Sequence, residues 1–331
     1  RAMARCFRSL ARRCSLGIPR QRHYCAADAL PFSSVDEVFS IEDCLVMKMH
    51  KEATGFNTIK FGRERYEEFL HAEMHYLGQG SYRKISLEDV LENSEPERLA
   101  KMICRELPPR FATRMRQIEA TPDWRSVPGM SEAHGMYQKS FRNLRIAETD
   151  GPVAKELDLH AIAEVVRDIK SRHDPALPNF ALIASGLKAR GTLDDAEVSH
   201  WVWKVIDARL GTDILTSHYL ERIRGCQKNH VGIVNMCCEP HQVCSEAILR
   251  VQRCLGGMPI KFELHGEESI RLPFIDKYLS CIVEELLKNA ASAALVSLEQ
   301  GRRQGTQVIQ LHLAAGGDCL AIKVSDEAGG I

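Results

Sequence analysis

Near the end of this 331-residue chain, a carboxylate and an amide lie four residues apart, at Glu285 and Asn289. In a helix, two side chains at this spacing project from the same face about one turn apart. The neighbouring positions are apolar or small, so the pair lies beside an apolar stripe. Such a pair is either a solvated feature of a helix surface or part of a site, since Glu284 and Lys288 also have the spacing of an ordinary surface ion pair.

A second group of this kind begins at Asp326, directly after a stretch that alternates apolar and polar residues as a half-buried strand does. Gly329 and Gly330 follow three and four residues later. Glycines let a backbone approach a ligand closely, while a carboxylate accepts hydrogen bonds from it. Each group alone is common on protein surfaces. Asn289 and Asp326 together, with strands between them, form a much more specific pattern that predicts a ligand site.

Hydrophobic spacing predicts the elements that must position these residues. A strand, a helix, a strand, a long helix and two strands are expected in that order, over 231–236, 244–255, 260–264, 275–298, 308–313 and 319–325. The long helix carries Glu285 and Asn289, and the last strand leads to Asp326. This part of the chain is therefore predicted to be an α+β layer of helices on a sheet.

Four amphipathic stretches upstream predict helices over 96–119, 131–147, 157–187 and 194–224, the third with a break near Pro175. Before them, Ser86 and Asp89 have the spacing of a helix capping box. The last helix is expected to turn inward Trp201, Val205, Leu210, Ile214 and Leu215. Four amphipathic helices joined by polar loops predict a bundle.

At its two site motifs the chain resembles the Bergerat-type ATP-binding fold shared by histidine kinases, DNA gyrase and mitochondrial protein kinases. Glu285 to Asn289 matches the helix motif, and Asp326 to Gly330 matches Asp-x-Gly-x-Gly except that Ala328 replaces the first glycine. The chain is most similar to the kinases of mitochondrial 2-oxo-acid dehydrogenase complexes, because further matches lie at 105–110, 209–211, 217–220 and 230–234. The resemblance covers 86–331 and fits the branched-chain member slightly better than the pyruvate dehydrogenase kinases.

The resemblance implies ATP and Mg²⁺ as cofactors and a role for each site residue. Glu285 would be the general base for an acceptor serine, and Asn289 would bind Mg²⁺ through its amide oxygen. Asp326 would accept a hydrogen bond from the adenine amino group. Further nucleotide contacts would come from Lys288, Ser292, Gly329 and Gly330. Phosphoryl transfer needs mainly alignment and charge neutralisation, so these few groups could suffice.

The resemblance also implies a function and a fold. We expect a serine protein kinase that phosphorylates, and so inhibits, the decarboxylase α subunit of a mitochondrial 2-oxo-acid dehydrogenase complex, with the branched-chain complex favoured over the pyruvate complex. It would bind the lipoyl-bearing acyltransferase core and form a homodimer when full length. The expected fold is α+β, an N-terminal four-helix bundle followed by a truncated Bergerat-type α/β sandwich, because no ATP lid follows Ile331 in this sequence.

Two alternatives to this function stay open at the level of sequence. The first is a non-catalytic fragment or pseudokinase that docks on the lipoyl-bearing core without phosphoryl transfer, and Ala328 favours it. The second is a histidine-type kinase or another ATPase of the same fold, which would need an acceptor histidine on a helix.

The first 27 residues differ from the rest of the chain in charge, since they contain arginines and no acid. The whole chain has 44 basic and 44 acidic residues, so the remainder is acidic. This pattern predicts a mitochondrial transit peptide and a matrix location, rather than a basic tail that binds nucleic acid. No apolar run reaches the roughly 18 residues that a membrane span needs. The expected layout is a transit peptide over 1–27, an extension of uncertain structure over 28–85, a four-helix regulatory domain over 86–225 and an incomplete ATP-binding domain over 226–331.

Several other residues have more than one interpretation. The twelve cysteines are scattered, which favours reduced thiols in a matrix protein. The cluster from Cys237 to Cys244 lacks the second half of a zinc site, so a strand-to-helix loop is expected there. His173 matches a histidine of the family's bundle, but a helix-breaking surface histidine explains it equally well. Trp201 and Trp203 are expected to pack in the core and at its rim.

Overall fold

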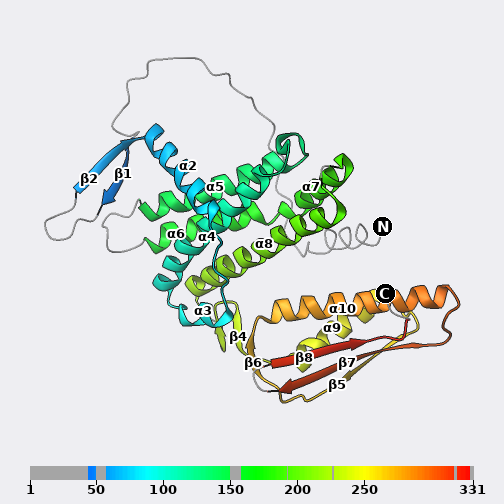
Figure 1. Cartoon of the computed structure of the whole chain (residues 1–331). Helices are drawn as coiled ribbons and strands as arrows, with labels where there is room; N and C mark the ends of the chain where they lie inside the picture. The colour runs from blue at the N-terminus through cyan, green and yellow to red at the C-terminus, as the bar shows by residue number, and fades with distance from the viewer. Residues whose placement is uncertain are drawn as a thin grey trace, which may run out of the picture. The chain divides into compact units, whose positions relative to one another are not determined.

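The computed structural model describes residues 44–49, 57–149, 158–191, 193–225, 227–316 and 319–328, with side chains from residue 64 onward. The chain forms two compact units, one ending at Ile223 and the other beginning at Arg224 (Figure 1). Helices and strands occur together, which confirms the predicted α+β class. The expected transit peptide over 1–27 lies outside the described residues, as do Gly329 and Gly330.

The first unit is mainly helical. Its elements are β1 (Cys44–Met49), β2 (Asn57–Gly62), α2 (Arg63–Gln79), α3 (Leu87–Glu92), α4 (Pro96–Glu119), the short 3₁₀ helix η2 (Trp124–Ser126), α5 (Met130–Thr149), α6 (Leu159–His173), α7 (Ala176–Arg190) and α8 (Asp195–Arg224). Helix α4 packs against α2 and α5, and α5 packs against α6 and α7. Ser86 caps α3 through the predicted capping box with Asp89. Within the described ranges, no helix combines the length and apolar character that crossing a bilayer requires.

Helix α4 contains two consecutive prolines and continues through both. Pro108 has no N–H to donate to the carbonyl of Cys104 four residues earlier, so that oxygen needs another donor. Nη1 of Arg145, from α5, lies 3.4 Å from it and donates the missing hydrogen bond. The predicted helix is confirmed over its whole length, since packing of its buried stripe from Leu99 to Ile118 holds it together.

The break predicted near Pro175 is confirmed and separates α6 from α7. His173 ends α6, but it is only 7% exposed, and its Nε2 lies 2.9 Å from Oγ of Ser140. Burial, with Arg209 and Arg172 nearby, lowers the pKa of His173 to about 3. His173 is therefore a buried neutral histidine, and its interpretation as a surface residue is wrong.

Helix α8 buries only part of the face that hydrophobicity predicts. Trp201, Val205 and Leu215 are buried as expected, but Leu210 is 48% exposed and Trp203 is 67% exposed. The buried face includes polar residues such as Thr212 and His218. Because these polar positions are internal, apolar spacing placed Leu210 incorrectly, and Trp203 is more exposed than the packing expected for it.

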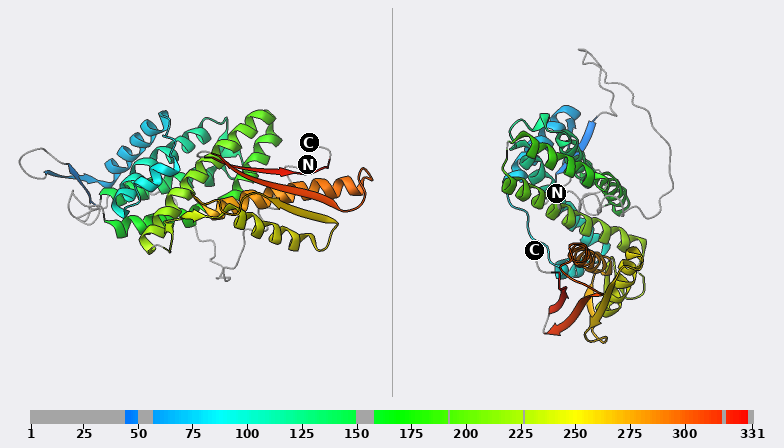
Figure 2. Two further views of the ribbon diagram at one scale, coloured as in Figure 1. Left: turned by 90° about the horizontal axis from the view of Figure 1, so that it is seen from below. Right: turned by 90° about the vertical axis from the view of Figure 1, so that its right-hand side faces the viewer.

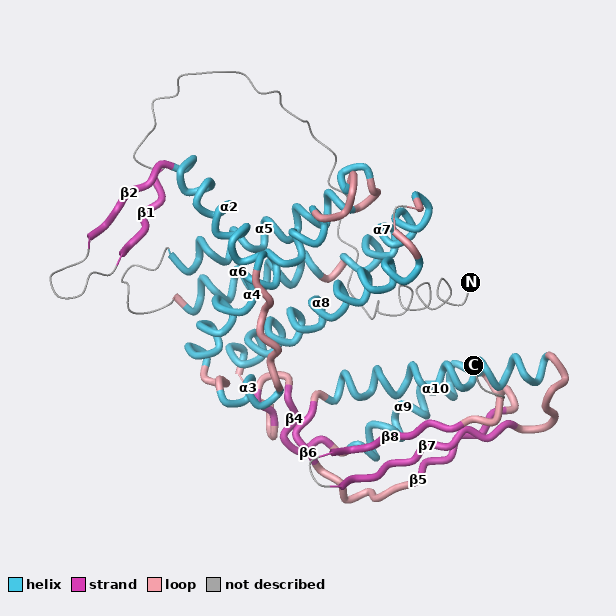
Figure 3. The backbone as a smooth tube through the Cα atoms, viewed as in Figure 1, coloured by secondary structure: helices cyan, strands magenta, loops and turns pink. Residues whose placement is uncertain are grey.

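The second unit consists of two helices on a sheet, with a smaller sheet beside them (Figure 1, Figure 2). Its elements are β3 (His230–Val231), β4 (Val234–Cys238), α9 (Pro240–Leu255), β5 (Ile260–His265), β6 (Leu272–Phe274), α10 (Asp276–Glu299), β7 (Gln307–Gly316) and β8 (Cys319–Ser325). The strand orders are β3-β4-β6 and β5-β7-β8, and Figure 3 draws both in magenta.

The larger sheet is mixed and has one covered face. Strand β5 runs parallel to β7, and β8 runs antiparallel to β7. Helix α9 packs on α10 and β5, while α10 packs on β7 and β8. Alternate residues of β7, including Ile309, Leu311 and Leu313, are buried in the same apolar cluster as Val283 and Leu287 of α10. The helix and the strand end that carry the predicted site therefore belong to the same packed unit, in which helices lie on one face of the sheet.

Three elements of this unit differ from the sequence-based expectation. The strand predicted over 231–236 is two strands, because Gly232 adopts a φ of 57° and turns the chain. Helix α9 begins at Pro240, earlier than predicted, since proline is well suited to the first turn of a helix. Strand β6 was not predicted, because its three residues are too few for a periodic pattern.

Candidate active site

Helix α10 has two chemically different faces. The face toward α9 and the sheet is buried and almost wholly apolar, formed by Leu279, Val283, Leu287, Ala290, Ala291, Ala294 and Ser297. Glu285 and Asn289 lie away from it, half-buried and exposed respectively, near the exposed side chains of Ile282 and Leu286. The two predicted site residues therefore share a solvent-accessible face, as their spacing requires.

Lys288 connects Glu285 to a network of ion pairs. Its Nζ lies 2.8 Å from Oε1 of Glu285 and 3.9 Å from Oε2 of Glu284. Glu284 in turn accepts a hydrogen bond of 2.6 Å from Nε of Arg250 on α9. The surface pair expected between Glu284 and Lys288 is present, but it is the longer of the two contacts. The carboxylate predicted to be a general base is thus bonded to a lysine.

Asn289 has no hydrogen-bond partner among the described residues, so its amide oxygen is free to accept a ligand. Ser292, three positions later, is also exposed. In the described part of the chain, no three His, Cys, Asp or Glu side chains are grouped closely enough to hold a metal ion.

Asp326 follows Ser325, the residue of β8 that pairs with Gln310 of β7. Its Oδ1 accepts a hydrogen bond of 2.9 Å from the backbone N–H of Ala328, an Asx turn that fixes the local loop. The second carboxylate oxygen has no partner among the described residues. That oxygen can accept a hydrogen bond from an amino group of a ligand.

An ion pair locates the Asp326 loop relative to α10. Nη1 of Arg303, in the loop after α10, lies 3.6 Å from Oε2 of Glu327. Asp326 therefore lies close to the chain that leaves the C-terminal end of α10. Asn289 lies about 15 Å before that end, at a rise of about 1.5 Å per residue. The structure thus places Asp326 near the C-terminal end of α10, and among the described residues no contact joins it to Glu285, Lys288, Asn289 or Ser292; Gly329 and Gly330 lie outside the described residues.

Ala328 departs from the glycine of the loop motif, but the backbone accommodates it. Only Asp123 and Asn229 have positive φ among the described residues other than glycine. Ala328 therefore lies outside the left-handed region that favours glycine, and its methyl group introduces no backbone strain.

A second polar cluster, in the helical unit, was not identified from the sequence. Arg110 and Arg114 of α4 are both buried. The guanidinium of Arg110 lies 4.6 Å from the ring centroid of Tyr82 and donates to the carbonyl of Arg83 at 2.7 Å. Burial lowers the pKa of both arginines. Their four-residue spacing within the apolar stripe of α4 was the signal that could have found them.

This arginine cluster explains the glycine of the Arg209-Leu210-Gly211 motif. A Cβ atom at Gly211 would lie 3.1 Å from Nη1 of Arg110. Arg209 donates to the backbone carbonyls of His173 and Asp174. The motif therefore makes room for one buried arginine and uses another to hold the junction of α6 and α7.

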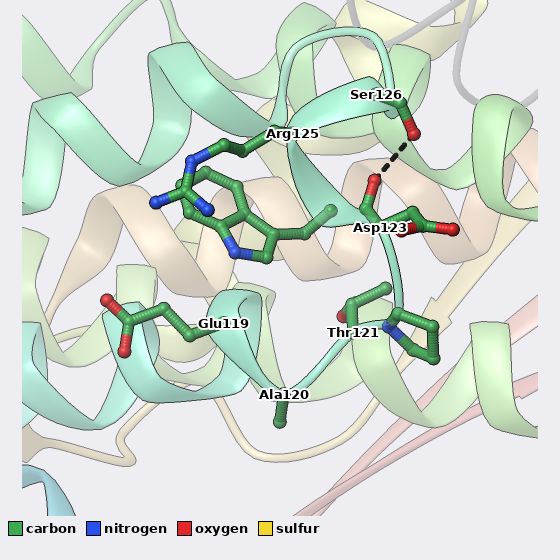
Figure 4. Close-up of a pocket in the computed structure, with 8 residues that line it drawn as sticks. Glu119, Ala120, Thr121, Asp123, Arg125 and Ser126 are labelled. Atoms are coloured by element: carbon green, nitrogen blue, oxygen red, sulfur yellow. Dashed lines mark hydrogen bonds between the residues drawn. The ribbon is translucent and has the colours of Figure 1, made fainter.

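A hollow on the helical unit contains none of the predicted site residues (Figure 4). It is lined by residues 119–126, between α4 and α5. Arg125 lies over one face of the Trp124 ring at 4.4 Å, and His134 stacks on the ring at 4.7 Å. Both neighbours belong to the chain itself, so Trp124 does not offer a free platform for an aromatic ligand.

Comparison with known proteins identifies several mitochondrial kinases that are similar to this chain. A sequence model of the mitochondrial branched-chain alpha-ketoacid dehydrogenase kinase matches residues 84–235. The chain is 26% identical over 288 residues to the mitochondrial pyruvate dehydrogenase (acetyl-transferring) kinase of Arabidopsis thaliana, which covers 82% of this chain and 77% of that protein. It is 23% identical over 244 residues to isozyme 3 of that kinase from Homo sapiens, covering 69% of this chain and 60% of that protein.

Isozyme 1 from Mus musculus gives a similar result, with 24% identity over 68% of this chain and 55% of that protein. The chain thus spans less than two thirds of the length of these mammalian relatives. The family model and the relatives thus show that the chain is similar, over much of its length, to the kinases of mitochondrial 2-oxo-acid dehydrogenase complexes.

Proposed function

We propose that this chain transfers the terminal phosphoryl group of ATP to a serine of the decarboxylase α subunit of a 2-oxo-acid dehydrogenase complex in the mitochondrial matrix, and thereby inhibits that complex. The observation that carries this proposal is a pair of oxygen acceptors, one on α10 and one at the end of β8, that have no hydrogen-bond partner among the described residues. The amide of Asn289 and the second carboxylate oxygen of Asp326 have no partners among the described residues. Both are oxygen acceptors of the kind that a magnesium nucleotide requires.

Each residue can be given a task in this reaction. Asp326 would hold the adenine amino group, and Asn289 would contribute an oxygen to Mg²⁺, which supplies neutralisation of the phosphate charge when bound. Glu285 would accept the proton of the serine hydroxyl. For this, Glu285 must exchange its bond to Lys288 for one to the hydroxyl. Lys288 would then direct its positive charge toward the phosphoryl oxygens, with Ser292, Gly329 and Gly330 close to the nucleotide.

We further propose that the branched-chain complex is the target, that the chain docks on the lipoyl-bearing acyltransferase core, and that the full-length protein is a homodimer. Support for the branched-chain complex comes from the description of the matching family model. The relatives named above are pyruvate dehydrogenase kinases, so the two complexes need a direct comparison.

The test is a phosphorylation assay with Mg²⁺-ATP and purified decarboxylases from the branched-chain and pyruvate complexes. We expect acid-stable phosphoserine on the α subunit, formed faster on the branched-chain protein. Glu285→Gln should lower the rate by about 100-fold or more, the typical contribution of a general base. Glu299→Gln is the matched control on the same helix and should keep the rate of the unchanged chain.

Two results would contradict the proposal in different ways. Faster phosphorylation of the pyruvate decarboxylase would overturn only the choice of target. Binding to the lipoyl-bearing core with no phosphoryl transfer and no binding of Mg²⁺-ATP would replace the kinase with a docking protein.

A further inference from the structure

Four charged side chains form a continuous series from α9 to Glu285. Arg250 of α9 donates through Nε to Oε1 of Glu284 at 2.6 Å. Oε2 of Glu284 lies 3.9 Å from Nζ of Lys288, which in turn lies 2.8 Å from Oε1 of Glu285. Positive and negative charges alternate along these four residues, and Nη1 of Arg250 also lies 3.5 Å from Oε2 of Glu246 on its own helix. Arg250 is the member that comes from the neighbouring helix.

Arg250 fixes the conformation of Glu284 by more than one contact. Its Nη2 donates to Oγ of Ser280 at 2.5 Å, and the same hydroxyl donates to Oε1 of Glu284 at 3.0 Å. One oxygen of Glu284 therefore serves Arg250 and Ser280, and only the other faces Lys288. A carboxylate neutralised in this way attracts a second cation less strongly than a free carboxylate does.

This arrangement decides which carboxylate holds Lys288. Glu284 and Lys288 have the i, i+4 spacing and the order along the helix that favour an ion pair. Their distance is nevertheless 3.9 Å, while the pair with Glu285 is closed at 2.8 Å. Without Arg250, the unneutralised Glu284 would compete for Lys288 and draw it away from Glu285. The face of α10 beside Asn289 would then also gain one negative charge.

We infer that Arg250 is a positioning residue that acts through Glu284 to keep Lys288 on Glu285 and to keep this face of α10 electrically balanced for an anionic nucleotide. The inference rests on the proposed function of the same face. Arg250 itself lies on α9 and bonds only to side chains of α9 and α10 among the contacts described, so it is assigned no contact with substrate.

The test measures binding of Mg²⁺-ATP by titration calorimetry, together with kcat and KM in the phosphorylation assay. Arg250→Met should weaken binding about five- to tenfold at low salt, as expected for an added charge within about 10 Å of a polyanion. KM for ATP should rise by more than kcat falls. Raising the ionic strength from about 0.05 to about 0.5 M should reduce the difference, because salt screens charges at this distance.

Three further variants separate positioning from loss of folding or of charge alone. Arg250→Lys should restore most of the affinity, because it keeps the cation near Glu284. Arg253→Met, on the same helix and exposed, removes the same charge away from Glu284 and should have a much smaller effect. In the Glu284→Gln background, Arg250→Met should weaken binding no more than Arg253→Met does, since the residue through which Arg250 acts is already neutral.

The outcomes distinguish this inference from the proposed function. If the unchanged chain binds Mg²⁺-ATP and Arg250→Met binds it equally well, the inference is wrong and the proposed function stands. An effect of Arg250→Met that is the same with Glu284 or Gln at position 284 would also overturn it. If the unchanged chain binds no Mg²⁺-ATP, the proposed function fails and the inference fails with it.

Discussion

The two units of the molecule place their polar side chains in opposite ways. In the helical unit, His173, Arg110 and Arg114 are buried, and burial displaces the pKa of each. In the sheet unit, Glu285 and Asn289 remain accessible on the outward face of α10. Burying a polar group costs free energy unless its partners compensate, whereas an exposed polar face costs little. Changes in the helical cluster should therefore affect folding, while changes on the outer face of α10 should affect ligands.

The largest effect should come from the buried side of α10. Leu287 is fully buried, and Leu286 beside it is 42% exposed. Leu287→Ala should lower the free energy of unfolding by about 3 kcal/mol through lost burial and a cavity. Leu286→Ala should lower it by less than about 0.5 kcal/mol. Urea unfolding followed by circular dichroism measures both, and equal effects would show that the two faces of α10 do not differ as described.

Acid should destabilise the helical unit through its buried histidines. Burial lowers the pKa of His173 to about 3 and, together with Arg222, the pKa of His218 to about 4. Below the unfolded value of about 6.5, the unfolded chain binds protons that the folded chain does not, so stability falls as the pH falls. Each histidine should contribute a loss of about 2 kcal/mol between pH 7.5 and 5.

Urea unfolding at the two pH values tests this expectation with two variants. In His173→Gln, the loss of unfolding free energy between the two pH values should be smaller by the contribution of His173. In His200→Gln, which changes an exposed histidine on α8, this loss should be the same as in the unchanged chain. A pH dependence that is unchanged in His173→Gln would contradict the assignment of His173 as a buried neutral group.

The same contrast explains which parts of the fold the sequence could predict. Helix α4 was predicted over its whole length because its apolar stripe is regular, although it contains Pro108 and Pro109. Leu210 was placed wrongly, because α8 buries the polar residues Thr212 and His218. Apolar spacing predicts helices well where the buried face is apolar, and it fails where the core contains polar groups.

The site was predictable only as far as local spacing determines it. Glu285 and Asn289 share a face because both belong to one helix, and the alternation of β8 located Asp326 at a strand end. The bond between Lys288 and Glu285 was not predicted, since i, i+3 and i, i+4 pairs are both possible on a helix. The contact that favours one of them comes from Arg250 on α9, and the sequence alone does not show which residues of two helices meet.

A smaller effect on stability should distinguish two helical glycines of the first unit. A Cβ atom at Gly135 of α5 meets nothing within 4 Å, whereas one at Gly211 of α8 would lie 3.1 Å from Nη1 of Arg110. Gly135→Ala should stabilise the protein by about 0.5–1 kcal/mol, because alanine loses less conformational entropy in a helix. Gly211→Ala should destabilise it by about 1 kcal/mol, since Arg110 is held by Tyr82 and Arg83 and cannot yield easily.

Thermal unfolding of the two variants gives this comparison directly, with each serving as the control for the other. Stabilisation of similar size in both would mean that Arg110 moves aside at little cost. The arginine cluster would then be less firmly packed than its burial indicates.

The smallest effect on stability, and the most informative for function, should follow from Asn289→Ala. Asn289 is exposed and has no hydrogen-bond partner among the described residues, so its loss should change the free energy of unfolding by less than about 0.7 kcal/mol. Affinity for Mg²⁺-ATP should nevertheless fall at least about tenfold, because the residue proposed to bind the metal is removed. A loss of stability above about 1 kcal/mol with unchanged affinity would make Asn289 a structural residue. Unchanged stability with lost affinity would instead show that the outer face of α10 serves ligand binding and not folding. The buried histidine and arginines of the helical unit cannot be changed in this way, because their loss is expected to affect folding itself.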